Sequence, residues 1–229
     1  MKISEIFYSI QGEGKLVGVP SVFVRASGCN LRCTWCDTPY ASWDPQGEET
    51  SVEQIVARVG AHRARHIVLT GGEPMIMPDI VPLSHALREE GYHITIETAG
   101  TVHADVAVDL ASLSPKLANS TPTERDGGRF APAHDKLRLN VPVLQALIDG
   151  SLDFQLKFVV AAPGDLDEIQ SLLGQLRHWH PPDVLLMPEG IDAEVLQSRG
   201  AWLADTCKRS GFRYCPRLHI QLFGNKRGT

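Results

Sequence analysis

Three cysteines, Cys29, Cys33 and Cys36, lie within eight residues in C-x3-C-x2-C spacing, and they constrain this chain more than any other feature. Three thiolates so close together can hold one compact metal centre. A 4Fe–4S cluster is normally held by four cysteines, so three would leave one iron with an open position, as catalytic metal sites do. The other two cysteines, Cys207 and Cys215, are distant in the sequence. We therefore expect a metal loop with one position free for a ligand.

Composition favours a single cytoplasmic domain covering residues 1–229. Hydrophobic residues make up 43% of the chain, which is enough for one sizeable core. The net charge of −5 gives no basic excess, so nucleic acid is not expected as a partner. No apolar run approaches the roughly 20 residues that span a bilayer, and the N-terminus, MKISE, carries no signal-peptide segment. The crowded cysteines suit a metal site in a reducing compartment better than a disulfide framework.

Short apolar segments typical of strands alternate with segments of helical periodicity. The strand candidates are 21–27, 66–70, 92–97, 106–110, 153–160 and 183–187. Helices are predicted over 51–59, 79–91, 141–148, 165–176 and 192–210. The first of these helices opens with a capping-box pattern, Ser51 with Gln54, and acidic caps at Asp79 and Asp165 are expected to open two others.

This alternation implies βαβ units and a parallel sheet. About six strands are too few for a closed eight-stranded barrel. We predict an incomplete, laterally open (β/α)6-type partial TIM barrel with parallel strands, and a doubly wound sheet is the alternative. The link between strands 92–97 and 106–110 is so short that its crossover helix must be reduced or absent.

Two stretches lack a clear pattern. Residues 118–136 contain proline and a Gly127-Gly128 pair without periodicity, and we interpret them as an exposed insertion or mobile loop. The tail, 213–223, shows strand-like alternation in part.

Unusual motifs follow five of the predicted strands, at 28–40, 71–74, 97–100, 114–116 and 188–190. In parallel α/β folds the chemistry collects at the carboxyl ends of the strands. We therefore expect these five segments to meet in one site.

A structural zinc site is the plainest alternative for the cysteines. Zinc would require four Cys or His ligands in paired spacing. Cys207 and Cys215 have seven residues between them and are unlike a second half-site, and no spacing recommends His62 or His66. An aromatic residue, Trp35, directly before the last cysteine favours a different reading.

The C-x3-C-x2-C spacing with Trp35 resembles the signature of radical S-adenosylmethionine enzymes, and Gly71-Gly72-Glu73-Pro74 resembles the second motif of that superfamily. The resemblance implies a 4Fe–4S cluster on Cys29, Cys33 and Cys36, whose open iron binds S-adenosyl-L-methionine. Two glycines permit close backbone approach to a ligand, and a carboxylate suits an ammonium group.

Further segments resemble the 7-carboxy-7-deazaguanine synthase family, a group of lyases in queuosine and related deazapurine biosynthesis. They cover most of the chain to about residue 160, and they are 5–14, 18–21, Arg25, Gly28-Cys29, 35–38, 97–100, 114–116 and 155–158. The resemblance implies conversion of 6-carboxy-5,6,7,8-tetrahydropterin to 7-carboxy-7-deazaguanine with loss of ammonia. It implies hydrogen abstraction at C6 by a 5′-deoxyadenosyl radical, followed by ring contraction.

The same resemblance implies roles for individual residues, with no side chain acting as a strong acid or base at the abstraction step. Cofactor binding is implied for Trp35, Gly72, Glu73, Gly100, Ser114, Pro115 and Lys116. Substrate binding is implied for Ile10, Gln11, Gly12, Glu13, Arg25 and Thr98. A Mg²⁺ ion touching the substrate is implied at Thr38, and hydroxyl, substrate and water oxygens suit that ion. The implied partners are an electron donor such as flavodoxin or ferredoxin and a second copy in a homodimer.

Plainer interpretations stay open for several of these residues. Arg25 alternates with apolar residues and would suit an outward-facing strand position; Thr38 suits a turn. Lys116 is a common loop lysine, and Lys157 between two apolar residues suits a snorkelling side chain. An activating enzyme for a glycyl-radical enzyme shares the cysteine motif without needing Arg25 or Thr38, and a non-catalytic iron–sulfur or zinc protein is a third possibility. The tail residues after 217 match the family poorly and receive no role.

Overall fold

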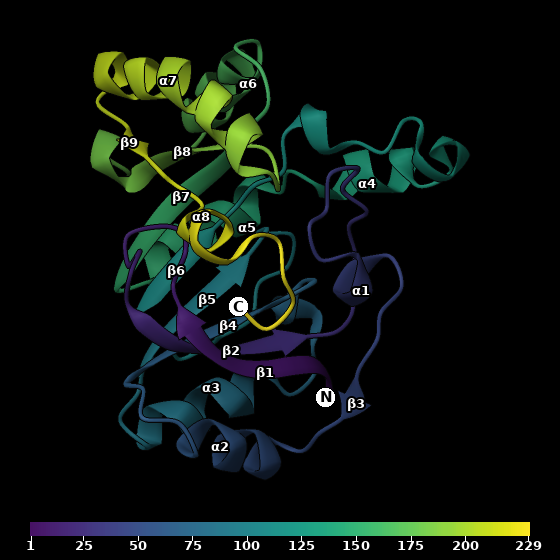
Figure 1. The fold of residues 1–229 in the computed structure, drawn as a ribbon, viewed down its shortest axis with the longest axis vertical. Helices are drawn as coiled ribbons and strands as arrows, with labels where there is room; N and C mark the ends of the chain where they lie inside the picture. The colour runs from purple at the N-terminus through teal and green to yellow at the C-terminus, as the bar shows by residue number, and fades with distance from the viewer.

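A computed structural model describes all residues, 1–229, as one mostly parallel open sheet with helices on its outer face (Figure 1). The strand order is β3-β1-β2-β4-β5-β6-β7-β8-β9. Every pairing from β2 to β9 is parallel, and β1 pairs antiparallel with both β2 and β3. This agrees with the predicted laterally open partial barrel. The strands are β1 (Lys2–Ile10), β2 (Pro20–Ala26), β3 (Glu48–Glu49), β4 (His66–Gly71), β5 (His93–Thr98), β6 (Leu110–Leu113), β7 (Asp153–Val160), β8 (Val184–Pro188) and β9 (Arg213–Tyr214).

Eight α-helices and four short 3-10 helices connect the strands. The α-helices are α1 (Pro39–Ser42), α2 (Val52–Gly60), α3 (Ile80–Glu89), α4 (Ala131–Leu137), α5 (Val141–Gly150), α6 (Asp165–Leu173), α7 (Ala193–Ser210) and α8 (Leu218–Phe223). The 3-10 helices are η1 (Pro74–Ile76), η2 (Ala118–Ser120), η3 (Arg125–Gly128) and η4 (Pro181–Asp183). No helix has the length and apolar character needed to cross a membrane.

The two faces of the sheet carry different side chains because neighbouring residues of a strand point to opposite faces. On the outer face, residues such as Ile67, Ile96 and Leu156 join one core with the helices, for example with Leu83 of α3. On the inner face the strands carry polar residues instead, among them Thr70, Glu97, Ser112, Gln155 and Lys157. The pairing aligns Glu97 with Ser112 and Ser112 with Gln155. The outer face therefore forms the core with the helices, and the polar inner face can line a binding site inside the open barrel.

Several local predictions were confirmed. Ser51 and Gln54 form the expected capping box of α2, β7 spans 153–160 as predicted, and no helix lies between β5 and β6. Asp79 lies at the N-cap of α3 as predicted, whereas the cap predicted at Asp165 was wrong, since Gly164 is the N-cap of α6. Asp79 makes no side-chain cap hydrogen bond and instead accepts from the N-terminal ammonium of Met1 at 2.9 Å. Asp165 accepts backbone N–H bonds from the turn before α6, at Ala161 and Ala162.

Other predictions were wrong in their bounds or their type. The strand expected at 106–110 begins at Leu110, where pairing with Thr95 starts. The tail forms only the two-residue β9, which pairs with β8, and then the helix α8, of which Ile220 alone is buried. The segment 118–136, expected to be a loop, contains η2, η3 and most of α4. That helix buries a histidine, His134, rather than an apolar stripe, so hydrophobic periodicity could not reveal it.

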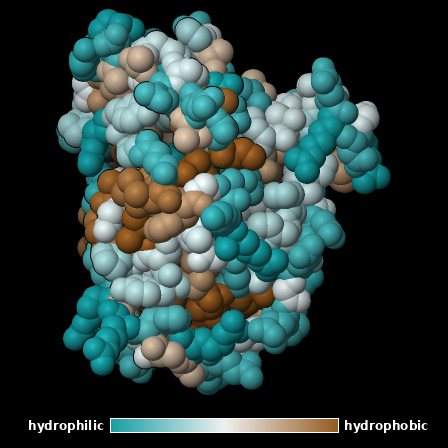
Figure 2. All heavy atoms as spheres, in the orientation of Figure 1, coloured by the Kyte–Doolittle hydropathy of each residue, from teal (hydrophilic) through white to brown (hydrophobic).

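The face shown in Figure 2 is hydrophilic over much of its area, and hydrophobic atoms gather around the position of α8. Leu222 and Phe223 of this helix are among the exposed large hydrophobic residues.

Candidate active site

A cavity of about 510 Å³ lies at the carboxyl ends of the strands. Segments that follow β2, β4, β5, β6 and β8 all contribute to its lining, together with the loop after β1 and the C-terminal tail. The predicted site residues that line it are Ile10, Gln11, Gly12, Glu13, Arg25, Cys29, Cys33, Trp35, Cys36, Thr38, Gly72, Thr98, Ser114 and Lys116. Glu73, Gly100 and Pro115 do not line it. The segments that the sequence predicted to meet therefore do meet.

The cysteine loop places three free thiols on this cavity. None of the five cysteines forms a disulfide, and Cys207 and Cys215 do not line the cavity. Burial raises the pKa of Cys29 to about 11 and that of Cys33 to about 12, so both favour the neutral thiol unless a cationic centre binds them. No group of three or more His, Cys, Asp or Glu side chains is arranged to hold a single metal ion.

The donor set fits an iron–sulfur cluster. Soft thiolates are the ligands that such clusters take, and three of them share one cavity with room for further atoms. A positive charge, Lys116, lies close enough to favour the thiolate forms of Cys29 and Cys33. The Lys116 ammonium donates to both oxygens of Ser114, at 2.7 and 2.8 Å, and lies 6.0 Å from the centre of the Trp35 ring.

The double glycine after β4 brings that strand against the cysteine loop. A Cβ atom on Gly72 would lie 2.2 Å from the carbonyl oxygen of Gly28, and one on Gly71 would lie 2.3 Å from that of Ala26. The N–H of Glu73 also donates to the Gly28 oxygen, at 2.9 Å. The glycines are therefore required for close packing of two backbones, whereas the sequence pointed to close approach of a ligand.

The Glu73 carboxylate is fully buried and is used within the protein. It accepts from the hydroxyl of Thr98 at 2.7 Å, from Ala99 N–H at 2.8 Å and from Met75 N–H at 3.1 Å. Burial raises its pKa, although these bonds oppose the shift. Glu73 thus ties the end of β4 to the end of β5, and it presents Thr98 to the cavity rather than lining the cavity itself.

Arg25 points into the cavity, not outward. Its Nε donates to Glu5 at 2.7 Å, and its guanidinium stacks over Phe7, 5.6 Å from the ring centre. The two terminal nitrogens have no acceptor in the protein, and Glu5 is further held by the hydroxyl of Tyr40 at 2.8 Å. A buried guanidinium with two free nitrogens is suited to bind a carboxylate in bidentate fashion.

The hydroxyl of Thr38 has only one, long contact within the protein. Thr38 is the N-cap residue of α1 but makes no side-chain cap bond, and its Oγ1 lies 3.9 Å from the sulfur of Cys36. The neighbouring hydroxyl of Ser42 is 3.1 Å from the same sulfur. Thr38 therefore offers a hard oxygen ligand at the edge of the cysteine loop.

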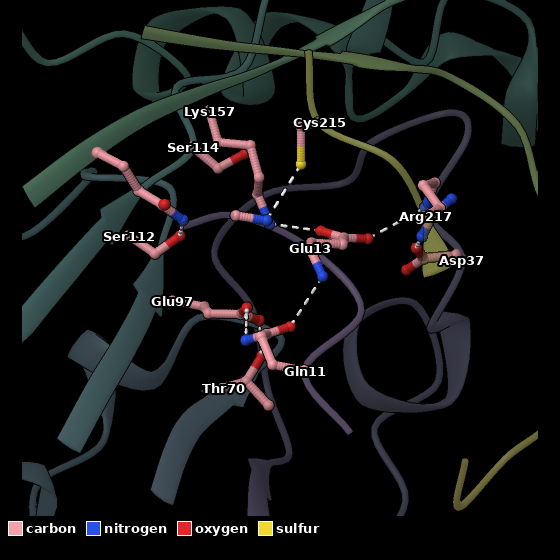
Figure 3. Close-up of polar contacts among 12 residues, drawn as sticks. Gln11, Glu13, Asp37, Thr70, Glu97, Ser112, Ser114, Lys157, Cys215 and Arg217 are labelled. Atoms are coloured by element: carbon pink, nitrogen blue, oxygen red, sulfur yellow. Dashed lines mark hydrogen bonds and ion pairs between the residues drawn. The ribbon is translucent and has the colours of Figure 1, made fainter. Parts of the chain in front are cut away.

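A second group of residues forms an ion-pair network that sequence reasoning did not assign (Figure 3). Glu13 pairs with Lys157 through one oxygen and with the Nε of Arg217, at 3.0 Å, through the other. Arg217 also pairs with Asp37 and donates to the carbonyl of Gly190 at 2.6 Å. We call Glu13, Asp37, Lys157 and Arg217 the ion-pair network; it joins the loop after β1, the cysteine loop, β7 and the tail.

The charges of this network compensate one another. Burial opposes ionisation of both acids, but Lys157 and Arg217 outweigh it and hold the pKa of Glu13 well below its usual range. Arg217 does the same for the pKa of Asp37. Lys157 is buried and paired, so the alternative of a snorkelling lysine was wrong.

The polar inner face of the sheet completes the cavity (Figure 3). Glu97 accepts from the side-chain amide of Gln11 at 3.2 Å and from the hydroxyl of Thr70 at 2.9 Å. The Gln11 oxygen in turn accepts from the N–H of Glu13. Polar residues alternating with apolar ones inside strongly apolar strands were the available signal for Glu97 and Lys157.

The tail closes one side of the cavity. His219 lines it and lies so near the loop after β1 that a Cβ on Gly12 would be 2.0 Å from its ring. Residues 225–229 also line the cavity, and Arg227 lies 4.4 Å from the ring centre of Tyr40. These contacts join residues more than 170 positions apart, and no local pattern in the sequence predicts them.

Known proteins resemble this chain in sequence and in fold. A family model for the radical SAM superfamily matches residues 23–119. A 7-carboxy-7-deazaguanine synthase of Halobacterium salinarum is 48% identical over 98% of this chain and 91% of its own length. One from Rhodopirellula baltica is 48% identical over 99% of this chain and 88% of its own length. The crystal structure of QueE from Escherichia coli matches with a TM-score of 0.70 and 28% identity, covering 95% of this chain and 94% of that one.

The identity extends over nearly the whole chain, including the tail that the sequence alone could not place. It is accompanied by the cavity, the three free thiols and the open parallel sheet described above. The family predicted from the motifs was confirmed: this chain belongs to the 7-carboxy-7-deazaguanine synthase family of radical SAM enzymes.

Proposed function

We propose that this chain converts 6-carboxy-5,6,7,8-tetrahydropterin to 7-carboxy-7-deazaguanine with loss of ammonia. The observation that carries the proposal is one cavity lined both by three free cysteines and by a guanidinium with two unpaired nitrogens. A metal-binding protein without catalysis would need only the first. The two relatives described above bear the name of this activity.

Cys29, Cys33 and Cys36 would hold a 4Fe–4S cluster, and Trp35, Gly72, Ser114 and Lys116 would line the place of S-adenosyl-L-methionine beside it. Together these cofactors supply one-electron cleavage of a sulfonium and so a hydrogen-abstracting species. Gly100 and Glu73 would act by shaping the strand ends, since neither lines the cavity. Pro115 would orient the two residues that flank it.

The remaining residues would bind and orient the substrate. Arg25 would take the substrate carboxylate through its free nitrogens. Thr38 would be a ligand of a Mg²⁺ ion that also contacts the substrate, because its hydroxyl makes no cap bond and has only a 3.9 Å contact with the Cys36 sulfur. Ile10, Gln11, Gly12, Glu13 and Thr98 would form the walls around the pterin ring. The tail would exclude water from a reactive intermediate.

Partners follow from the chemistry. Reductive cleavage needs an electron, so an external reductant such as a flavodoxin or ferredoxin must reach the cluster. We further expect a homodimer, and a deazapurine pathway as the destination of the product.

Anaerobic reconstitution tests the proposal. The chain should bind four irons and, with S-adenosyl-L-methionine, a reductant, Mg²⁺ and the carboxylated tetrahydropterin, should release 7-carboxy-7-deazaguanine. The product can be identified by mass spectrometry. A brown, four-iron protein that forms no deazapurine would exclude the proposed substrate and leave another radical activity, such as activation of a glycyl-radical enzyme. A protein that takes up zinc and no iron would exclude the whole assignment.

A further inference from the structure

The segment 117–137 is folded onto the cysteine loop, and we call it the clamp segment. Several contacts join the two, among them a hydrogen bond from Arg125 to the carbonyl of Thr34 at 3.1 Å and the Arg32 guanidinium over the Phe130 ring, 5.5 Å from its centre. The N–H of Thr34 donates to the carbonyl of Ser120 at 2.8 Å. The indole N–H of Trp35 donates to the carbonyl of Asn119 at 3.0 Å. His134 makes a further contact, in which its ring accepts from the backbone N–H of Arg32.

His134 is 1% exposed and both its ring nitrogens are used. Nδ1 accepts from the backbone N–H of Arg32 at 3.1 Å, and Nε2 lies 2.9 Å from the hydroxyl of Ser120. That hydroxyl donates to the carbonyl of Leu117 at 2.6 Å.

These contacts determine the tautomer. A backbone N–H can only donate, so Nδ1 must be unprotonated. The ring proton then sits on Nε2 and is donated to Ser120, whose own proton goes to Leu117. Burial lowers the pKa of His134 to about 4, which keeps the ring neutral near pH 7. Every polar atom of the ring therefore has one defined partner.

We propose that His134 is a positioning residue for the cluster. It fixes the backbone between Cys29 and Cys33 by accepting from the N–H of Arg32, and it is held in place for this by the clamp segment. The inference rests on the proposed assignment of the cysteines as cluster ligands. Between these two cysteines the other hydrogen bonds involve side chains, and the Arg32 guanidinium donates to the carbonyls of Cys29 and Leu31 at 2.6 and 2.8 Å. Asn30 bonds to Thr101 at 3.0 Å, and the N–H of Leu31 faces the sulfur of Cys29 at 3.4 Å. The Arg32 N–H is thus the backbone amide between Cys29 and Cys33 that bonds to another segment of the chain.

A second buried histidine in the same chain provides the control. His66 of β4 is also buried, has a pKa lowered by burial to about 4, and bonds through both nitrogens, to Ser21 at 2.6 Å and Thr95 at 2.8 Å. It begins its strand, whereas the cavity lies at the opposite, carboxyl end. A role confined to stability would make the two histidines equivalent in their effect on the cluster. A positioning role would make them different.

Two conservative variants separate the two ring nitrogens. The amide oxygen of His134→Asn can take the place of Nδ1 and accept from Arg32. The amide nitrogen of His134→Gln can take the place of Nε2 and donate to Ser120, but it leaves the Arg32 N–H without an acceptor. His134→Ala removes both contacts, and His66→Asn and His66→Gln are the matched controls.

The first measurement uses the cluster-free protein. Amide hydrogen exchange at Arg32 should be about 10-fold faster in His134→Gln and His134→Ala than in the unmodified chain, and within about 3-fold of it in His134→Asn. The second uses the reconstituted protein. The rate of iron release to a chelator should follow the same order, and the electron paramagnetic resonance spectrum of the reduced cluster should shift in the Gln and Ala variants. The His66 variants should lower the unfolding temperature. They should leave amide exchange at Arg32, the rate of iron release and the electron paramagnetic resonance spectrum unchanged.

Equal effects of His134→Asn and His134→Gln would overturn the proposal, as would a cluster unchanged in all His134 variants. An effect of the His66 variants as large as that of His134→Gln would also overturn it. If the unmodified chain binds no cluster, the proposed function fails first. If His134→Ala does not fold, the Asn and Gln variants alone decide.

Discussion

Two regions of the cavity use polar groups in opposite ways. At the cysteine loop and Arg25, the groups that matter are unpaired: three thiols without a disulfide, a threonine hydroxyl without a cap bond, and two guanidinium nitrogens without an acceptor. In the ion-pair network the acids Glu13 and Asp37 are matched by Lys157 and Arg217. In the first region these groups lack strong partners within the protein, and in the ion-pair network every charged group has a partner of opposite charge.

Physical chemistry explains why the two differ. A polar group that faces the cavity without a protein partner can bond to a ligand there without breaking a hydrogen bond inside the protein. A buried ion pair contributes little net stability, but removal of one partner is strongly destabilising because it strands the other charge. We therefore assign the unpaired groups to ligand binding and the ion-pair network to holding the tail and the loop after β1 in place.

The largest expected effect is loss of the cluster. Cys33→Ala should abolish iron binding and reduce product formation to background, because two thiolates cannot hold the cluster. The same change removes only a small buried group, so the cluster-free protein should lose roughly 1 kcal/mol of stability. Iron analysis and urea unfolding check the two halves of this prediction. Full iron content together with full activity in Cys33→Ala would remove Cys33 from the ligands.

The second effect is on folding. Arg217→Met should lower the free energy of unfolding by about 3–5 kcal/mol, because it leaves Asp37 unpaired and Glu13 with one cation. Arg227→Met is the control in the same tail. Arg227 is 47% exposed and pairs with Glu5, so its loss should cost less than about 1 kcal/mol. Urea unfolding of the cluster-free variants measures both effects. Equal losses of unfolding free energy in Arg217→Met and Arg227→Met would contradict the structural role of the ion-pair network.

The smallest effect is expected at Thr38. Thr38→Ala should raise the Mg²⁺ concentration for half-maximal activity about 10-fold or more, since even outer-shell partners of metal ions contribute that much. Stability and cluster absorbance should change little, because the one protein contact of this hydroxyl, with the Cys36 sulfur, is 3.9 Å long. Ser42→Ala, which removes the neighbouring hydroxyl near the same sulfur, should leave the Mg²⁺ dependence intact. An unchanged Mg²⁺ dependence in Thr38→Ala would place the ion elsewhere or remove it.

The region around the cysteine loop and Arg25 could be predicted from the sequence, and the ion-pair network could not. The cysteine spacing, the double glycine and the strand-end position of each motif are local, so the cavity and most of its lining followed from them. The parallel strands β2, β4, β5, β7 and β8 were predictable for the same reason, because each apolar segment signals its own strand, whereas the antiparallel β1 was not predicted and β6 begins only at Leu110.

The ion-pair network could not be predicted because it joins residues that lie far apart in the sequence. Glu13 and Arg217 are 204 positions apart, and nothing near Arg217 distinguishes it from a surface arginine. The clamp segment was missed for a different reason: α4 buries His134, and a helix that packs through a polar residue shows no apolar stripe. The role of Glu73 also depended on the structure, since only the fold shows that Thr98, Ala99 and Met75 occupy its carboxylate.

The central claim is that the unpaired groups of the cavity are completed by ligands, and Arg25 tests it most directly. Binding of 6-carboxypterin and of pterin lacking the carboxylate can be compared by calorimetry, with S-adenosyl-L-methionine and Mg²⁺ bound to the reconstituted protein. We predict that the unmodified chain binds the carboxylated form about 10–100-fold more tightly, as expected for charge-assisted hydrogen bonds. Arg25→Gln should lose this preference and stay folded, because Glu5 keeps Tyr40 and Arg227 as partners. Equal binding of the two pterins by the unmodified chain, or a full preference in Arg25→Gln, would contradict the claim.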